Sequence, residues 1–406
     1  MTSQTSIATG ALPDSPPAAA RAVLHLLKSL NHGTLDLQLP GGGSAHFGTH
    51  AAGEPRAAIR LHNWNMFAAA LKAGDIGFAE SYIAGDWTTP DLTTLLTLLG
   101  ANRDRLESVI YGSWWGSLLY RARHLLHRNS RAGSQKNVHA HYDLGNPFYR
   151  LWLDPTMNYS SAWFEGDRSA DLVSAQWAKV RRALRECGVR PGHRVLEIGC
   201  GWGALAECAA REFGATVTGV TLSTEQLAWA EARLVKADLP AELRLQDYRD
   251  IDDGPFDAIA SIEMFEAVGR AYWPGFFETL KTQLKPGGLA CIQSITIRDD
   301  LFERYVKASD FIQQYIFPGG LLPSPQAFRA AAARSGLTVV HELEFGLDYA
   351  ETLRRWRARF LAAETPVRKL GFDSRFMRIW EFYLAYCEAA FTTGNTSVMQ
   401  FTLRRD

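Results

Sequence analysis

The sequence is poor in cysteine and has no surplus of charge of either sign. Five cysteines occur in 406 residues, and 43 basic side chains balance 43 acidic ones. The cysteines show no paired spacing, which argues against a disulfide framework or a zinc site and indicates a reducing compartment. They are Cys187, Cys200, Cys208, Cys291 and Cys387. Zero net charge gives no overall attraction to nucleic acid or to an anionic membrane, so any such attraction must be local.

Long apolar runs are also missing. The chain contains no run long enough to span a bilayer, which takes about 18 or more apolar residues. Residues 1–20 lack the apolar centre of a signal peptide and are rich in Ala, Ser and Pro, which predicts a disordered tail. We therefore expect a cytoplasmic protein whose length suffices for about two or three domains.

The most informative stretch is residues 194–206. Val195, Leu196 and Ile198 form a short apolar run that predicts a buried parallel strand. Glycines then follow at positions 199, 201 and 203, and an apolar-periodic helix begins at about Ala204. Glycine allows a sharp turn and a close approach by a ligand, and a helix N-terminus offers free N–H donors. This pattern predicts a nucleotide-type site at the end of a first strand, with a plain tight turn as the alternative.

The order of the following elements narrows the fold. Strands are predicted at 215–220, 242–245, 257–262 and 289–295, the last after a Pro-Gly-Gly turn at 285–288. The residues of interest that follow the first three of these strands are Thr221, Leu222, Ser223 and Gln226, then Asp247 and Tyr248, then Glu263 and Glu266. This order is typical of a class I S-adenosylmethionine-dependent methyltransferase. We therefore predict an α/β fold with a Rossmann-like seven-stranded sheet.

The rest of the chain predicts further elements around that sheet. Helices are expected at 300–315, 325–336, 349–363 and 376–391, with strands at 338–345 and, antiparallel, at 397–403. A small α+β domain is expected at 21–126, with helices at 21–30, 64–73 and 91–99, strands at 33–39 and 57–61, and a turn at 74–77. Asp91 should cap the third of these helices. The expected division is a tail at 1–20, the N-terminal domain, a basic linker at 127–140 and a catalytic domain at 141–406.

A span without acidic residues, 108–142, joins these two domains. It contains Trp114 and Trp115, followed by a set of basic residues that includes Arg121 and Arg123. One interpretation is an amphipathic helix that contacts phospholipid, with Trp at the interface and Arg on headgroups. The other is an interdomain helix followed by a solvated basic linker.

Short motifs from about residue 141 to the C-terminus resemble the cyclopropane-fatty-acyl-phospholipid synthase family. They are residues 141–146 (HYDLGN), 157–160 (MNYS), 195–203, 219–223 (GVTLS), 246–249 (QDYR), 264–266 (MFE), 315–320 (YIFPGG) and 348–349 (DY). The resemblance implies that Tyr159 and Ser160 close over S-adenosylmethionine. It also implies that the N-terminal domain is lipid-associated and that the helices at 300–336 and 349–391 wall an acyl tunnel.

The residue types add detail to the cofactor site. Gly199 and Gly201, with Cys200 between them as a small filler, should let the methionine part lie on the loop, and Glu197 should orient that loop. Gln226, with Thr221, Leu222 and Ser223, replaces the usual acid and can hydrogen-bond ribose hydroxyls. Asp247 and Tyr248 should grip the adenine by a hydrogen bond and by stacking. No metal is expected.

An alkene is a weak nucleophile, so the enzyme must exclude water, align the double bond and then remove a proton. In the resembled family a bicarbonate ion removes it, and the positions that hold this ion fall on Ser161, Glu266, Gln293, Ile295 and Tyr349. Ser161 replaces a cysteine whose backbone amide is used, and Gln293 replaces a histidine. Glu263 is interpreted as a charge at a helix N-terminus. Cys387 matches a family cysteine once proposed as catalytic, with simple packing as the alternative.

The expected function is therefore transfer of a methyl(ene) group from S-adenosylmethionine to the double bond of an unsaturated phospholipid at the membrane surface, forming a cyclopropane fatty acid. Methyl-branched or methylene products are reachable from the same cation. A small-amine N-methyltransferase and a non-catalytic lipid-binding protein remain open as other classes. Peripheral binding at the inner membrane face and a homodimer are also left open, and no nucleic acid partner is expected.

Overall fold

The computed structural model describes residues 16–49, 51–106 and 144–406, which form two compact units. The first unit joins the N-terminal segment to Lys307–Ile316 and Gly371–Thr393. The second contains most of the remaining chain up to Asp406. The basic linker, the aromatic and arginine-rich span and residues 141–143 of the first family motif lie outside the described residues.

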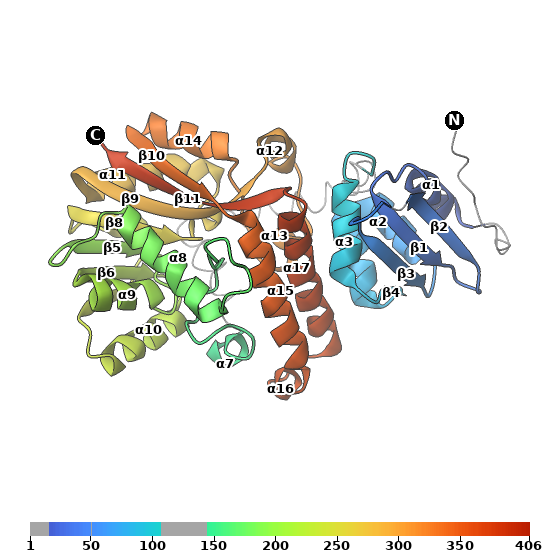
Figure 1. The fold of residues 1–406 in the computed structure, drawn as a ribbon, viewed down its shortest axis with the longest axis horizontal. Coiled ribbons are helices and arrows are strands. Elements are labelled where there is room, and N and C mark those ends of the chain that lie inside the picture. Colours follow the sequence, from blue (N-terminus) through green and yellow to red (C-terminus); the bar gives the residue numbers. More distant parts are fainter. Residues whose placement is uncertain (1–15, 50, 107–143) are drawn as a thin grey trace. The chain divides into compact units, whose positions relative to one another are not determined.

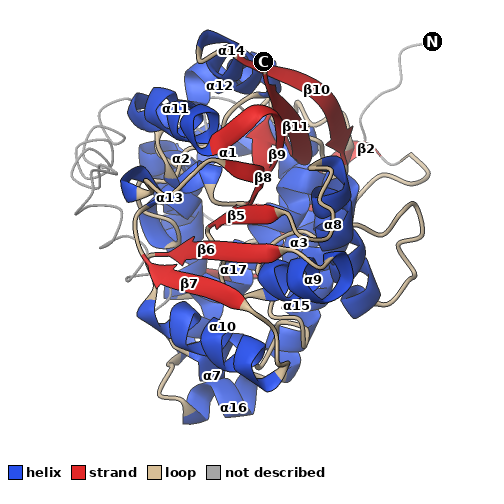
Figure 2. Ribbon diagram, turned by 90° about the vertical axis from the view of Figure 1, so that its left-hand side faces the viewer, coloured by secondary structure: helices blue, strands red, loops and turns tan. Residues whose placement is uncertain are grey.

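The second unit is built on a seven-stranded sheet in the order β10-β11-β9-β8-β5-β6-β7 (Figure 2). Its strands are β5 (Arg194–Ile198), β6 (Thr216–Thr221), β7 (Ala241–Leu245), β8 (Phe256–Ile262), β9 (Leu284–Ile297), β10 (Leu337–Glu344) and β11 (Thr396–Arg405). Strands β5 to β9 are parallel, whereas β11 runs antiparallel to both β9 and β10. The predicted Rossmann-like sheet with an antiparallel last strand is confirmed.

Helices form a separate apolar core on each face of this sheet (Figure 1). Val195 of β5 shares one core with α8 (Leu172–Glu186), α9 (Ala204–Phe213) and α10 (Thr224–Lys236). Leu196, the next residue, shares the other with α11 (Trp273–Gln283) and α14 (Pro325–Arg334). Successive side chains of a strand point to opposite faces, so an apolar run such as Val195-Leu196 serves both cores.

Short helices and one long helix complete the second unit. They are α7 (Asn146–Tyr149), α12 (Asp299–Tyr305), α15 (Gly346–Ala362), α16 (Glu364–Lys369) and three 3-10 turns, η1 (Tyr248–Asp250), η2 (Phe265–Ala267) and η3 (Arg270–Tyr272). Because β5, β6, β8 and β9 are parallel, the loops after the first three strands meet at one edge of the sheet. This edge carries the glycine loop and the polar residues that the sequence singled out.

The first unit has a four-stranded sheet in the order β2-β1-β3-β4. Its elements are α1 (Ala18–Leu27), β1 (Gly33–Gln38), β2 (Ser44–Thr49), β3 (Arg56–Leu61), α2 (Asn65–Ala84), β4 (Trp87–Thr88), α3 (Leu92–Ala101), α13 (Phe311–Tyr315) and α17 (Ser374–Thr392). Asp91 caps α3 as predicted, through a 3.1 Å bond from Thr94 N–H to its Oδ1. Phe382 of α17 packs against Phe78 and Tyr82 of α2. The helices expected to wall an acyl tunnel are thus divided between the two units.

Five local predictions differ from the structure. Helix α1 already begins at Ala18, inside the predicted tail. The turn at 74–77 is only a kink at Ala73 and Gly74 within α2, because Ile76, Ala79 and Tyr82 continue the buried face. Strand β2 was missed because Phe47 is its one buried residue, so its sequence has no clear alternation.

Strand β9 begins at Leu284, before the predicted Pro-Gly-Gly turn. Leu284 pairs with Phe256 of β8, and the glycines are taken up by a register shift between the two strands. The predicted helix at 300–315 is likewise divided into α12 and α13, and Asp310 caps the second piece by accepting a 2.8 Å bond from Gln313 N–H. The predicted helix is therefore interrupted between α12 and α13, although the sequence pattern there is compatible with a continuous helix.

Candidate active site

The glycine loop after β5 is shaped by three residues with positive φ. A Cβ at Gly199 (φ +84°) would lie 3.0 Å from the Met264 side chain, and one at Gly203 (φ +81°) 2.9 Å from the Ala230 Cβ. These two glycines therefore allow close packing of the loop. A Cβ at Gly201 (φ +50°) would meet no atom within 4 Å. Gly201 thus faces open space in which a ligand can lie against the backbone.

A buried carboxyl and a buried amine lie beneath this loop. Glu197 of β5 is buried, and its Oε2 has no hydrogen-bond partner within the described part of the chain. Burial raises the pKa of Glu197 to about 8, against the opposing effect of the Ala206 backbone, Arg233 and Lys179. Burial also lowers the pKa of Lys179 to about 8, against nearby Glu263, Asp154 and Glu197. The Lys179 ammonium group donates a 2.5 Å hydrogen bond to the Ser160 hydroxyl. Ser160 is therefore joined to the same buried polar groups as Glu197.

The end of β6 orients Gln226. Ser223 is the N-cap of α10 and accepts a 3.3 Å bond from the Gln226 backbone N–H. The Thr221 hydroxyl donates a 3.0 Å bond to Gln226 Oε1, so the amide NH2 group is what Gln226 can offer to a ligand. Leu222 between them is half-buried. The unpaired Glu197 oxygen, the open side of Gly201 and this amide fit the amino acid and ribose parts of S-adenosylmethionine.

Asp247 already has a partner that sequence reasoning did not assign to it. Its Oδ1 accepts bonds from the Arg249 backbone N–H at 3.0 Å and from Arg249 Nε at 2.8 Å, and Oδ2 accepts from Nη2 at 2.5 Å. Tyr248 packs edge-on against Phe276, and burial raises its pKa to about 12. The adenine contact expected of Asp247 and Tyr248 stays a prediction, in which Asp247 is oriented by Arg249.

Tyr159 stands in a group of aromatic rings that the sequence did not single out. Its ring centroid lies 5.5 Å from Tyr149, 5.4 Å from Trp152 and 5.5 Å from Trp356.

Cys200 is buried, and burial raises the pKa of its thiol well above the usual value. A Cβ at Gly219 would lie 3.1 Å from the Cys200 Cβ, so Cys200 is a tightly packed filler, with its backbone in the glycine loop.

The residues expected to hold an anion converge instead on Glu263. Its Oε1 accepts bonds from Ser161 N–H at 2.9 Å and from Gln293 Nε2 at 2.7 Å. Its Oε2 accepts a 2.7 Å bond from the Tyr349 hydroxyl. Glu263 also has a φ of +51°, a strained value for a residue with a side chain that is typical of functional positions. The helix-terminal role predicted for Glu263 is therefore wrong, because its carboxyl group is buried at the centre of these donors.

Glu266 faces the neighbouring strand rather than Gln293 and Tyr349. Its Oε1 accepts bonds from the Ile295 backbone N–H and, at 3.1 Å, from the Ser294 hydroxyl. Burial, and secondly the charge of Glu263, raise the pKa of Glu266 to about 8. Burial also raises the pKa of Glu263, but Lys179 and three hydrogen bonds oppose the shift. Glu263 is therefore the member of the pair that has Lys179 and three hydrogen-bond donors to stabilise its ionised form.

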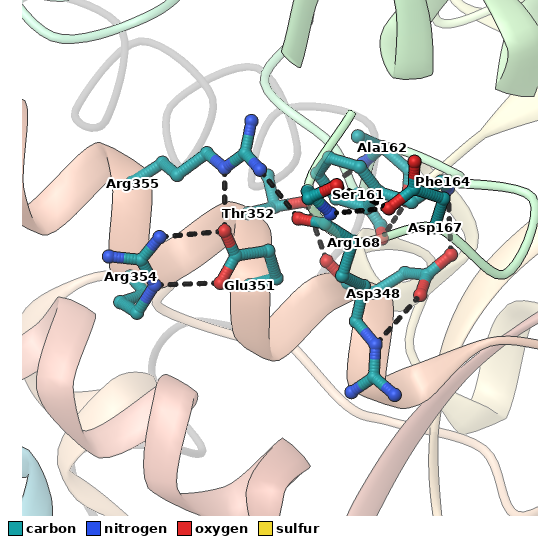
Figure 3. Close-up of polar contacts among 11 residues, drawn as sticks. Ser161, Ala162, Phe164, Asp167, Arg168, Asp348, Glu351, Thr352, Arg354 and Arg355 are labelled. Carbon is teal, nitrogen blue, oxygen red and sulfur yellow. Dashed lines mark hydrogen bonds and ion pairs between the residues drawn. The ribbon is translucent and has the colours of Figure 1, made fainter. Parts of the chain in front are cut away.

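Helix α15 holds the loop that carries Ser161 (Figure 3). The Thr352 hydroxyl accepts a 3.2 Å bond from Ala162 N–H, and Asp348 Oδ2 accepts a 2.8 Å bond from Phe164 N–H. Arg355 donates a 2.7 Å bond to the Arg168 carbonyl, and Figure 3 shows it also paired with Glu351. These contacts fix the backbone that follows Ser161, whose own N–H donates to Glu263.

Cys387 lies in α17, in the first unit. Burial, and secondly the charge of Asp310, raise the pKa of its thiol above the usual value. A nucleophilic cysteine needs a thiolate, so these surroundings favour the packing role over the catalytic one.

Among the described residues no group of three or more His, Cys, Asp or Glu side chains is arranged to hold a metal ion. Within the same ranges, no helix has the length and apolar character needed to cross a bilayer.

The chain is similar to several known proteins. The family model described as mycolic acid cyclopropane synthetase matches residues 129–401. The tuberculostearic acid methyltransferase UfaA1 of Mycobacterium tuberculosis is 38% identical over 98% of this chain and 95% of its own length. The cyclopropane-fatty-acyl-phospholipid synthase of Escherichia coli is 34% identical over 87% of this chain and 89% of its own.

A solved structure shares the catalytic fold. The mycolic acid cyclopropane synthase CmaA1, complexed with SAH and CTAB, is 33% identical and superposes with a TM-score of 0.62. The match covers 66% of this chain and 98% of that structure. The bound SAH is the product form of S-adenosylmethionine, so the relatives identify the cofactor class that the glycine loop and Gln226 fit.

Proposed function

The chain belongs to the mycolic acid cyclopropane synthetase family of S-adenosylmethionine-dependent methyltransferases, and we propose that it modifies the double bond of an unsaturated phospholipid acyl chain. The product proposed first is a cyclopropane fatty acid. The observation that carries the proposal is the carboxyl group of Glu263, which accepts hydrogen bonds from Ser161, Gln293 and Tyr349. A carboxylate fixed by several donors can serve as the base that this chemistry requires.

When bound, S-adenosylmethionine supplies an electrophilic methyl group. Gly201 and Gln226 would hold this cofactor, and the aromatic rings around Tyr159 would exclude water from it. Once one alkene carbon has gained the methyl group, the other carries a positive charge. Glu263 then takes a proton from the added methyl group, and the electron pair of that C–H bond closes the three-membered ring. Loss of a proton from a neighbouring chain carbon would instead leave a methyl-branched alkene.

We further propose that Glu263 performs the role that bicarbonate performs in the resembled family. Three of the five expected anion contacts, from Ser161, Gln293 and Tyr349, are made to this one carboxyl group. Gln293 is uncharged, so its hydrogen bond does not neutralise a carboxylate at Glu263. The positive charge that acts on Glu263 is that of Lys179. A base that is part of the chain also needs no binding equilibrium before it can act.

A methyl-branched product is the second candidate. The relative whose match extends over 98% of this chain is a tuberculostearic acid methyltransferase by name. The deciding experiment incubates the protein with labelled S-adenosylmethionine and mixed unsaturated phospholipids, followed by mass analysis of the acyl chains. A gain of one CH2 with loss of the alkene means a ring, and a retained alkene means branching. Label found only on an added amine, or none transferred, would overturn the proposal.

The proposed partner is unsaturated phospholipid at the inner membrane face, bound peripherally by a cytoplasmic enzyme, with a homodimer still a prediction. Replacing Arg121 and Arg123 by Glu should weaken sedimentation with anionic vesicles, because each basic residue near such a surface contributes about 1 kcal/mol. The control replaces the exposed Arg190 and Lys236 by Glu, which changes the net charge equally. Equal effects in the two double variants would contradict a local membrane contact.

A further inference from the structure

Three side chains, from α8, β9 and β11, form a continuous line of hydrogen bonds that ends on Glu263, in the loop after β8. Gln293 of β9 and Gln400 of β11 are opposite each other in the antiparallel pair and both are fully buried. Gln400 Nε2 donates a 3.0 Å bond to Gln293 Oε1, and Gln293 Nε2 donates to Glu263. At the other end, Arg182 of α8 donates from Nη1 to Gln400 Oε1.

The direction of this line is set by its first member. A guanidinium group can only donate hydrogen bonds, so Gln400 must present its oxygen to Arg182. Its NH2 group then serves Gln293 Oε1 and, at 3.3 Å, the Lys179 carbonyl. Gln293 is left with its NH2 group toward Glu263. Turning either amide around would place two acceptors, or two donors, face to face in a buried site.

Arg182 is itself held from several sides. Its Nη2 lies 3.1 Å from His341 Nδ1 and 3.4 Å from Glu186 Oε1. Its guanidinium carbon lies 5.7 Å from the ring centroid of Trp163. The side chain is 7% exposed, so its position is fixed by these contacts rather than by solvent. The line of hydrogen bonds therefore begins at a fixed donor. That donor determines which group donates and which accepts in each following bond, as far as the Glu263 carboxyl group.

We propose that Arg182 and Gln400 are positioning residues for the reaction, which act through Gln293 to keep a donor aimed at the Glu263 carboxylate. This inference rests on the base role proposed for Glu263. Other groups also face that carboxylate: Lys179 from α8, Tyr349 from α15 and Glu266 from the same loop, while Glu197 and Asp154 face Lys179. None of these groups contributes to the orientation of the Gln293 amide, which makes the line separately testable.

Gln400→Glu is the sharpest test because it keeps the shape and reverses the direction. A carboxylate at 400 still accepts from Arg182 but also attracts the Gln293 NH2 group, so the Gln293 oxygen turns toward Glu263. Glu263 should then hold its proton to higher pH. We expect the acidic limb of the pH–kcat profile to move up by about one pH unit. We also expect kcat to fall about tenfold, with the KM for S-adenosylmethionine unchanged.

Two further variants separate direction from charge and from folding. Gln400→Met keeps the side-chain length without adding a buried charge, and should lower kcat because Gln293 loses its anchor. Arg182→Lys keeps a donor for Gln400 and should retain the wild-type pH profile, whereas Arg182→Gln should move it. The matched control is Arg181→Gln, the neighbouring arginine, which pairs with Glu212 at the surface. It should leave the profile unchanged.

The outcomes distinguish this inference from the proposed function. If the wild type transfers methyl groups to acyl chains but both Gln400 variants keep its pH profile and kcat, the positioning role is overturned. If the wild type transfers no methyl groups to acyl chains, the proposed function fails. The positioning role is then tested by infrared titration of the Glu263 carboxyl band, which is assigned with Glu263→Gln. A titration midpoint that Gln400→Glu does not raise would overturn the positioning role.

Discussion

The Tyr349 hydroxyl donates a 2.7 Å hydrogen bond to Oε2 of Glu263, across 86 residues of sequence. Tyr349 comes from α15, and the same helix holds the Ser161 loop through Asp348 and Thr352. One helix therefore supplies one donor to the carboxyl group and positions a second. This arrangement gives each carboxyl oxygen of Glu263 at least one hydrogen bond from the protein.

The first prediction tests the base. Glu263→Gln keeps the shape but removes the group that takes the proton, so the initial rate of label transfer to acyl chains should fall on the order of 100-fold. Tyr349→Phe removes one of three donors and should lower it about tenfold. Cofactor affinity, measured by calorimetry, should change little in both. Tyr305→Phe, whose hydroxyl accepts from Leu322 N–H instead, is the control. A Glu263→Gln rate above a tenth of wild type would contradict the assignment.

The second prediction concerns stability and pH. The pKa of Glu266 is about 8 in the folded chain against a usual 4.5. Between these values the folded state keeps a proton that the unfolded state releases, so stability falls as pH rises, by up to about 1.4 kcal/mol per pH unit for this group. Glu266→Gln removes the titration and should make the fall shallower, leaving the similar contribution of Glu197. Urea unfolding at several pH values measures it.

The control for this prediction is Glu364→Gln in α16, whose side chain is 54% exposed and pairs with Arg368 at the surface. It should leave the slope of stability against pH unchanged, because exposed pairs contribute little. A wild-type slope that Glu266→Gln does not alter would show that Glu266 is ionised in the folded chain, and the proton would then have to be reassigned within the carboxyl pair.

Much of the fold could be predicted because its signals are local. Val195, Leu196 and Ile198 specify a strand by themselves, and the three glycines after them specify a turn that only glycine adopts. The signals failed where tertiary contacts decide. Leu284 starts β9 early because Phe256 is beside it, and α2 continues through Gly74 because its buried face continues.

The centre of the site could not be predicted for the same reason. Glu263 receives its hydrogen bonds from residues 102, 30 and 86 positions away. A single acid after a strand gives no sign of such partners. Resemblance named Ser161, Gln293 and Tyr349 as holders of an anion, and in the structure their donors meet on the Glu263 carboxyl group. The signal that was available is the position of Glu263 directly after a mostly apolar strand, at the edge of the sheet where ligands bind.

The third prediction tests the glycine loop. Because a Cβ at Gly201 would meet no protein atom within 4 Å, Gly201→Ala adds a methyl group that only a ligand would touch. Affinity for S-adenosylmethionine, measured by calorimetric titration, should fall about tenfold or more. Gly192→Ala is the matched control, since Gly192 also has positive φ and open space around its Cβ. Equal affinity in the two variants would show that the cofactor does not lie on Gly201.

The last prediction asks whether Glu263 has replaced an external anion. The wild-type rate should be indifferent to added bicarbonate, because the donors of Ser161, Gln293 and Tyr349 are already bonded to Glu263. Glu263→Gly removes the carboxyl group, and glycine adopts the φ of +51° without strain. Its low rate should therefore rise with bicarbonate or formate, small anions that fit the vacated donors, at constant pH and ionic strength. Glu263→Gln fills the same place with an amide and should not be rescued. The assignment would be contradicted by a wild-type rate that rises with bicarbonate together with a Glu263→Gly variant that does not respond. A separate anion would then be the base, and Glu263 would only hold that anion in place.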